Sequence, residues 1–157
     1  MERPPNGRSK LLVDTGALLA LAMRKDQHHR AAVAFLERAP HTRFVMTNLV
    51  LAEVATRLRA RAGVEKTVGL VRDLLNSRRY EVVFVDRPLF DAALIKMEQY
   101  DDKALSLPDC ASFALMDALG LDTAFAFDTD FRDCGYRIVP PTSVAEKGSN
   151  LSSEWRR

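Results

Sequence analysis

The chain has 157 residues, of which 47% are hydrophobic and 28% charged, a size and composition that suit one globular domain rather than two. Its formal net charge is only +2, and no apolar run approaches the length that spans a membrane, which excludes a membrane-spanning protein. The N-terminus lacks the apolar core of a signal peptide, and the two cysteines show no metal-ligand spacing, so we expect a cytoplasmic protein.

Charge is distributed unevenly along the chain. Residues 51–79 contain seven basic and three acidic residues, whereas residues 86–133 contain four basic and eleven acidic residues. A basic region facing a polyanion and an acidic region facing cations would suit a metal-dependent enzyme that acts on nucleic acid. Ordinary fluctuation of surface charge explains the pattern equally well, so charge alone leaves both interpretations open.

The first half of the chain predicts short strands that alternate with amphipathic helices. A leader over residues 1–9 precedes the apolar run KLLVD, which predicts a strand ending on Asp14. Thr47 is placed to cap a later helix, and Gly63 to end it. The predicted helices and the second strand are, in chain order, helices at 15–23 and 26–39, a strand at 44–46, and helices at 48–61 and 64–76.

The second half continues the alternation. Strands are predicted at 81–86, 123–127 and 136–140, and helices at 88–99 and 108–119, the latter ended by Gly120. Strands that alternate with helices form a parallel sheet covered on both faces, here with about five strands. We therefore predict an α/β fold with one domain over residues 10–142, followed by a polar tail over residues 143–157.

Two acidic residues of the first half stand at informative positions. Asp14 directly follows the apolar run LLV, at the carboxyl end of a predicted buried strand, where it could equally cap the next helix. Glu53 lies roughly 110° around its helix from the centre of the apolar face, at the margin of the buried side. A carboxylate there needs a partner, which is either Arg57 one turn later or a bound cation.

Three acidic residues of the second half share this ambiguity. Asp109 follows Pro108 in the first turn of a predicted helix, where the helix dipole stabilises an acid. Asp128 and Asp130 follow the apolar strand AFAF, where an Asp pair could simply build a turn. Taken together, however, most of these acids fall at strand exits and helix starts, where an α/β sheet assembles its ligand site. Carboxylates gathered there repel one another unless a cation such as Mg²⁺ or Mn²⁺ neutralises them.

Three segments of the sequence resemble the PIN domain, most closely the ribonuclease toxins of the VapC type. The segments are VDTGALLAL, TNLVLAEVATRLR and SLPDCASFALMDALGLDTAFAFDTDF, and the resemblance extends over residues 11–140 with the acids in the family's order. It implies a three-layer α/β/α sandwich around a parallel sheet. Two departures are that Pro108 replaces the usual Thr or Ser before the third acid, and that Thr129-Asp130 replaces a pair such as Arg-His.

The resemblance also implies an activity and the residues that carry it. Asp14, Glu53, Asp109 and Asp128 match the family's acidic quartet, and Asp130 matches a less constant fifth acid. The implied reaction is hydrolysis of RNA phosphodiester bonds by water activated on a divalent cation, Mg²⁺ or Mn²⁺, held by these carboxylates. From their nearness to the quartet in sequence or helical phase, and not from the resemblance, we expect Arg57, Arg61 and Lys103 to contact the RNA backbone, although each also suits an ordinary surface charge.

The expected partners are an RNA substrate, a small antitoxin protein and a second copy of the chain. Two alternatives remain from the residues. One is a non-catalytic PIN-like module that binds RNA or protein, and the other is a different acid-rich α/β phosphohydrolase. A dehalogenase-like phosphatase would have a second Asp two positions after the first, where this chain has Gly16.

Overall fold

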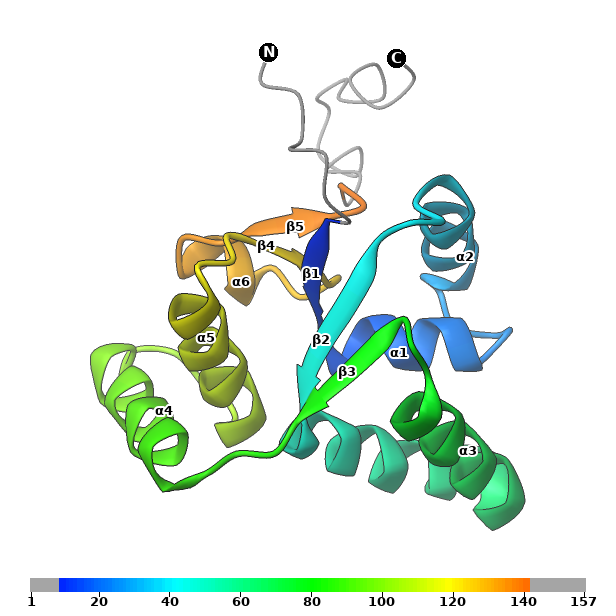
Figure 1. The fold of residues 1–157 in the computed structure, drawn as a ribbon, viewed down its shortest axis with the longest axis horizontal. Helices are drawn as coiled ribbons and strands as arrows, with labels where there is room; N and C mark the ends of the chain where they lie inside the picture. The colour runs from blue at the N-terminus through cyan, green and yellow to red at the C-terminus, as the bar shows by residue number, and fades with distance from the viewer. Residues whose placement is uncertain (1–8, 142–157) are drawn as a thin grey trace.

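A computed structural model of the chain describes residues 9–141, and its centre is a five-stranded sheet in which all strands are parallel (Figure 1). The strand order is β3-β2-β1-β4-β5. The strands are β1 (Lys10–Val13), β2 (Arg43–Thr47), β3 (Tyr80–Val83), β4 (Thr123–Phe125) and β5 (Arg137–Val139). The predicted parallel sheet of about five strands is confirmed. The predicted tail, and the predicted leader apart from Ser9, lie outside the described residues.

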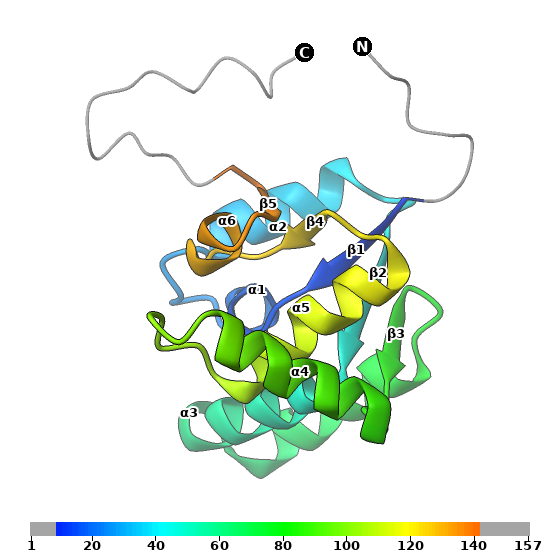
Figure 2. The ribbon, with the colours of Figure 1, turned by 90° about the vertical axis from the view of Figure 1, so that its left-hand side faces the viewer.

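Helices cover both faces of the sheet and form the outer layers (Figures 1 and 2). One layer contains α1 (Thr15–Ala22), α2 (His29–Arg38) and α3 (Asn48–Asn76), and the other contains α4 (Arg87–Gln99), α5 (Leu107–Leu119) and α6 (Asp130–Asp133). Alternate residues of each strand point to opposite layers: Leu12 packs with the α4–α5 side and Val13 with the α1–α3 side. The predicted three-layer α/β/α arrangement is confirmed. No helix within residues 9–141 is both long and apolar enough to cross a membrane.

The parallel register brings the carboxyl ends of the central strands to one edge of the sheet. Val13 at the end of β1 pairs with Phe125 at the end of β4, and the Asp14 amide donates to the Phe125 carbonyl at 3.0 Å. At the end of β2, the Thr47 hydroxyl accepts a hydrogen bond from the Val50 amide at 3.2 Å, so Thr47 caps α3 as predicted. The chain segments that leave β1, β2 and β4 therefore begin close together.

The sequence prediction was wrong in detail around the edge strand β3 and the helix after it. The predicted strand 81–86 ends at Val83, Phe84 is 68% exposed, and Asp86 instead caps α4 by accepting from the Leu89 amide at 3.0 Å. The apolar spacing of α4 predicts an inward face of Phe90, Ala93, Leu94 and Met97, but only Ala93 is fully buried, and Leu94 is 41% exposed. The reason is that α4 packs mainly on α5 rather than on the sheet, so α5 covers only a narrow strip of the surface of α4. The short helix α6 was not predicted.

Gly63 interrupts α3 and joins its two halves, at the point where the sequence likewise predicts that one helix ends and another begins. Its φ of 82° and ψ of 177° lie in a region that only glycine occupies readily. We expect Gly63→Ala to lower the free energy of unfolding by about 1–3 kcal/mol, measured by urea denaturation. The cost is one of backbone conformation, because a Cβ at Gly63 meets no atom within 4 Å.

Gly69, which lies in the second half of α3, provides the matched control. A Cβ there also meets no atom within 4 Å, and its φ is not in the positive range. Gly69→Ala should therefore raise stability by about 0.5–1 kcal/mol, as expected for alanine in a helix interior. Equal effects of the two substitutions would contradict the role assigned to Gly63.

Candidate active site

The carboxyl edge of the sheet holds a pocket of about 300 Å³ that is lined by acidic side chains. All five acidic residues selected from the sequence line this pocket, and they come from four separate segments of the chain. They are Asp14 after β1, Glu53 in α3, Asp109 in the first turn of α5, Asp128 after β4, and Asp130 at the start of α6. The fold therefore brings together residues that are as much as 116 positions apart, as Asp14 and Asp130 are.

Asp14 is the most buried of these carboxylates, with only 5% of the residue exposed. Burial raises its pKa from the ordinary value of 3.8 to about 7, and the negative charges of Asp109, Asp128 and Glu53 add to the shift. Asp14 occupies the N-cap position of α1, as the sequence allowed, but its side chain makes no capping hydrogen bond there. Asp14 thus holds a proton more tightly than a surface carboxyl does.

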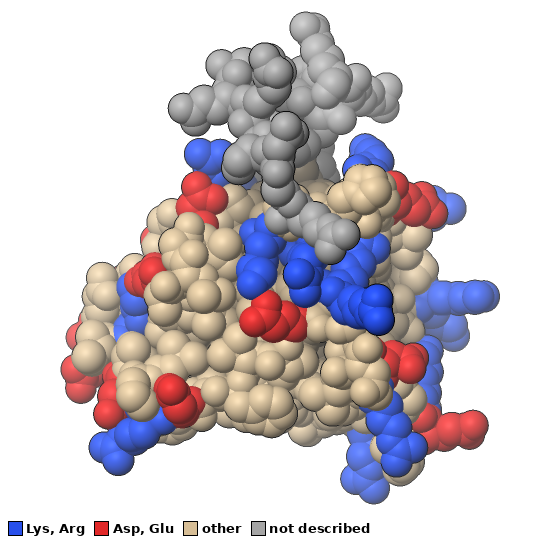
Figure 3. Space-filling model, in the orientation of Figure 1, with Lys and Arg blue, Asp and Glu red and all other residues tan. Residues whose placement is uncertain are grey.

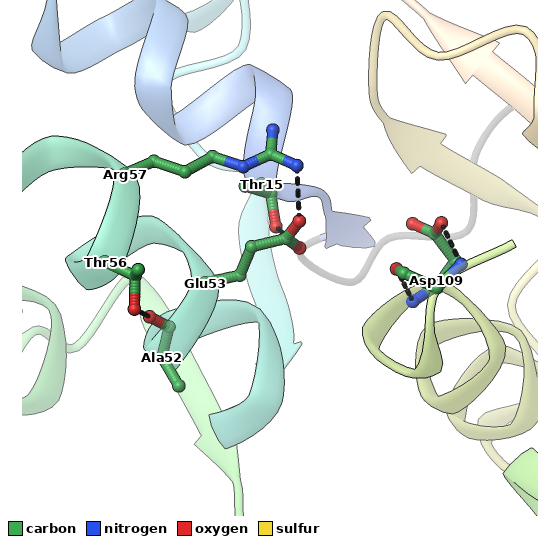
Figure 4. A network of polar contacts seen from close by, with 7 residues as sticks. Thr15, Ala52, Glu53, Thr56, Arg57 and Asp109 are labelled. Atoms are coloured by element: carbon green, nitrogen blue, oxygen red, sulfur yellow. Dashed lines mark hydrogen bonds and ion pairs between the residues drawn. The ribbon is translucent and has the colours of Figure 1, made fainter. Parts of the chain in front are cut away.

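Glu53 is held in place by two donors, one on each carboxylate oxygen. The Thr15 hydroxyl donates to Oε2 at 2.8 Å, and Nη2 of Arg57 contacts Oε1 at 2.6 Å. Figure 4 shows this carboxylate facing Asp109 across the site, with Arg57 reaching over it from the next turn of α3. The sequence left Arg57 and a cation as alternative partners; the structure shows the ion pair, and Glu53 still lines the acidic pocket.

Asp109 is fastened to the start of α5 by a reciprocal pair of hydrogen bonds. Its Oδ2 accepts from the Ser106 amide at 3.0 Å, and the Ser106 hydroxyl accepts from the Asp109 amide at 3.2 Å. Burial raises the pKa of Asp109, the two bonds with Ser106 oppose this, and the charges of Asp128 and Glu53 reinforce it. Ser106 also supplies a hydroxyl near the site, so the departure at Pro108 leaves the helix start properly capped.

Asp128 and Asp130 stand at the outer side of the pocket. Asp128 is exposed, and its Oδ1 accepts from the Asp130 amide at 2.9 Å, which is the turn-building role considered from the sequence. The pKa of Asp130 is raised by partial burial and by the charges of Asp128 and Asp133, while Lys103 lowers it. Lys103 is therefore near this end of the site, although it does not line the pocket.

The donor set of the pocket fits a hard divalent cation, because it consists of carboxylate and hydroxyl oxygens. Within residues 9–141, however, no group of three or more Asp, Glu, His or Cys side chains is arranged so that it could hold a metal ion without rearrangement. The hydrogen bonds explain this: Glu53 is directed to Thr15 and Arg57, and Asp109 to the Ser106 amide. Binding an ion would require carboxylates to turn toward one another, and neutralising their repulsion would favour that change.

Sequence reasoning missed two polar residues of the pocket, Thr15 and Ser106. Ser106 could have been found, since Ser-x-x-Asp before an apolar run is a capping signature. Thr15 could not, because its bond to Glu53 joins residues 38 positions apart. Among the cations expected to contact RNA, Arg57 lines this pocket, whereas Arg61 lines a separate groove.

Comparison with known proteins gives concordant matches in sequence and structure. The family model described as PIN domain matches residues 11–135. A curated relative, the 23S rRNA-specific endonuclease VapC20 of Mycobacterium tuberculosis, is 33% identical over 132 residues, covering 83% of this chain and 98% of the relative. The crystal structure of M. tuberculosis VapC20, a Sarcin-Ricin loop cleaving toxin, matches with a TM-score of 0.74 and 29% identity, covering 80% of this chain and 95% of that chain.

More distant structures share the fold. A toxin-antitoxin complex from Klebsiella pneumoniae matches with a TM-score of 0.61 at 18% identity, covering 84% of this chain and 98% of that one. VapBC2 from Rickettsia felis, bound to a promoter DNA fragment, matches with a TM-score of 0.60 at 14% identity, covering 82% of this chain and 96% of that one. At these identities the likeness concerns the fold alone.

Proposed function

The chain belongs to the PIN domain family, and from that premise we propose that it is a divalent-metal-dependent endoribonuclease of the VapC type. The observation that carries the proposal is the convergence of Asp14, Glu53, Asp109 and Asp128 on one pocket at the carboxyl edge of the sheet. An acidic pocket of this kind repels an RNA phosphate unless a cation lies between them, which is why we propose Mg²⁺ or Mn²⁺ as the cofactor.

Each carboxylate has a role that its surroundings suggest. Asp14, Asp109 and Asp128 would hold the ion, and Glu53 would bind the ion or its water, oriented by Thr15 and Arg57. When bound, the ion would supply a Lewis acid for the phosphoryl oxygens and a water of lowered pKa as nucleophile. Because the pKa of Asp14 is about 7 without the ion, ion binding would release the proton from its carboxyl group. Asp130 remains a candidate fifth acid.

The proposed partners follow from the relatives. VapC20 is named for cleavage of 23S rRNA, so we propose ribosomal RNA as the first substrate to test. Because the Klebsiella structure is that of a toxin-antitoxin complex, we propose a small antitoxin protein as partner. A homodimer and a cytoplasmic location complete the proposal; free, buried Cys110 and Cys134 are compatible with a reducing compartment.

Incubation of the purified protein with 23S rRNA and with a mixed RNA pool tests the proposal. We expect discrete cleavage products with Mg²⁺ or Mn²⁺ and none when a chelator is added. Restoring activity by adding back the metal in excess of chelator controls for irreversible damage. Cleavage that persists at full rate with chelator would contradict the metal dependence, and hydrolysis of small phosphate esters without RNA cleavage would favour the other phosphohydrolase class.

A further inference from the structure

A groove of about 560 Å³ lies at the junction of α1, α2 and α3, and neither the proposed catalytic residues nor the core occupies it. Half-buried apolar residues line part of it, among them Leu21 in the last turn of α1, Met23 directly after α1, and Ala62 in α3. Exposed basic residues line the rest. These four cations are Arg24, Lys25, Arg61 and Lys66.

Four basic side chains and one acidic side chain line this groove, so positive charge predominates in it. Within residues 9–141, none of the four cations forms an ion pair, whereas Arg57, Lys96, Arg87 and Lys10 each do. The one acidic residue lining the groove is Asp26, whose Oδ1 accepts a hydrogen bond from the His28 amide at 2.8 Å. This excess of cations, contributed by two separate segments, creates a local positive potential that attracts a polyanion.

The groove is joined to the acidic pocket by two neighbouring helices. Residues at the start of α1, Thr15 and Gly16, line the pocket, and residues at its end line the groove. In α3, Arg57 lines the pocket and Arg61, one turn later, lines the groove. The Thr15–Glu53 hydrogen bond ties the two helices together at the pocket end.

The separation of the two sites suits a short stretch of nucleic acid. Helix α1, which lines the pocket at its start and the groove at its end, has eight residues and is about 12 Å long. At about 3.4 Å or more per phosphate, that distance accommodates roughly two to four nucleotides. A charged groove with apolar surface beside it is also the arrangement by which proteins follow a single strand, with cations on the phosphates and apolar groups near the sugars and bases.

We propose that this groove binds the phosphate backbone of the RNA substrate on one side of the bond that is cut, with Lys25 and Lys66 as principal contacts. The inference rests on the proposed function, since it assigns the groove to the same RNA. It predicts that affinity depends on RNA length, because only a strand that reaches from the acidic pocket into the groove gains these contacts.

The test is RNA affinity after both lysines are removed. A 12-nucleotide labelled single-stranded RNA is titrated, by fluorescence anisotropy with Mg²⁺, against protein carrying Asp109→Asn to prevent cutting. Adding Lys25→Ala and Lys66→Ala should raise Kd about tenfold or more and reduce the slope of log Kd against log salt by about 1.4, the loss of two phosphate contacts. Lys25→Arg with Lys66→Arg should retain the affinity and the slope.

The matched control removes two arginines from another part of the surface. Arg43 and Arg137 are exposed and begin β2 and β5, so they lie at the amino edge of the parallel sheet, away from the acidic pocket. Figure 3 shows basic side chains gathered on the face that contains this part of the sheet. Arg43→Ala with Arg137→Ala should leave Kd within about twofold, while circular dichroism confirms that both double variants are folded.

The outcomes separate the two claims. If the wild-type protein cuts RNA but Lys25→Ala/Lys66→Ala binds it like the control pair, the groove inference is overturned and the proposed function stands. Unchanged RNA binding by Lys25→Ala/Lys66→Ala is also the result expected if the groove binds a protein partner instead of RNA. If the wild-type protein cuts no RNA with either metal, both the proposed function and the inference are overturned.

Discussion

Replacing Asp109 with asparagine is expected to reduce RNA cleavage by about 10²–10⁴-fold while leaving the protein folded. Asparagine keeps an oxygen that can accept from the Ser106 amide, so the cap of α5 survives. It loses the negative charge that the proposed ion requires, and the lost stabilisation of the transition state amounts to several kcal/mol. Cleavage rates under single-turnover conditions with saturating Mg²⁺ or Mn²⁺ measure the effect.

The stability of Asp109→Asn should change little. Burial and the charges of Asp128 and Glu53 disfavour the ionised carboxyl group, so removing the charge relieves repulsion and offsets the weaker interaction with the helix dipole. Asp101→Asn is the matched control, because Asp101 is exposed and does not line the acidic pocket. We expect the control to cut RNA at the wild-type rate. Comparable rates for both variants would remove Asp109 from the site.

Replacing Asp14 with asparagine is expected to change how stability depends on pH. The pKa of Asp14 is 3.8 ordinarily and about 7 in the folded protein, so between these values the unfolded chain ionises first. In wild-type protein without metal, this group therefore lowers the free energy of unfolding as pH rises from about 4 to about 7, and the loss is complete above about 7. Its size is on the order of a few kcal/mol.

Urea denaturation with chelator at pH 5 and at pH 8 measures this dependence. Asp14→Asn should flatten it and should be more stable than wild type at pH 8, because no buried charge forms. Asp101→Asn should follow wild type at both pH values. A pH dependence that is equally steep in Asp14→Asn would show that the group responsible lies elsewhere.

The same variant tests cation binding without measuring activity. A divalent ion that binds only the folded wild-type protein raises its unfolding temperature as the ion concentration rises. Mg²⁺ or Mn²⁺ should therefore stabilise the wild-type protein at pH 8 and leave Asp14→Asn unchanged, measured by thermal unfolding. Equal stabilisation of both proteins would place the ion outside the pocket.

Much of the fold could be predicted from local sequence patterns. Alternating apolar strands and amphipathic helices gave a parallel sheet with helices on both faces, and the caps at Thr47 and Gly120 were placed correctly. These features depend on residues that are close together in the chain, so they can be predicted from local sequence patterns. The errors occurred where tertiary packing determines which side chains are buried. Because β3 is an edge strand and α4 packs on α5, the sequence periodicity predicted more buried residues in these two elements than the structure shows.

The candidate site divides in the same way. The sequence placed Asp14 and Asp128 at strand exits and Asp109 at a helix start, and the polarity of a parallel sheet brings such positions to one edge. The sequence left two possible partners for Glu53, Arg57 and a bound cation. The position of a residue around its helix predicts the direction of its side chain but not the group that the side chain contacts. In the folded chain Glu53 pairs with Arg57 and accepts a hydrogen bond from Thr15 while it also lines the acidic pocket.

By itself, the sequence determined the α/β class, the order of the acids and the strands and helices that carry them, because hydrophobic periodicity and capping act over a few residues. Only the tertiary structure decided that burial would raise the pKa of Asp14 to about 7, and that Arg61 and Lys66 would line the same groove as Lys25. Burial and through-space charge depend on the packing of segments far apart in the chain. No local pattern encodes those distances.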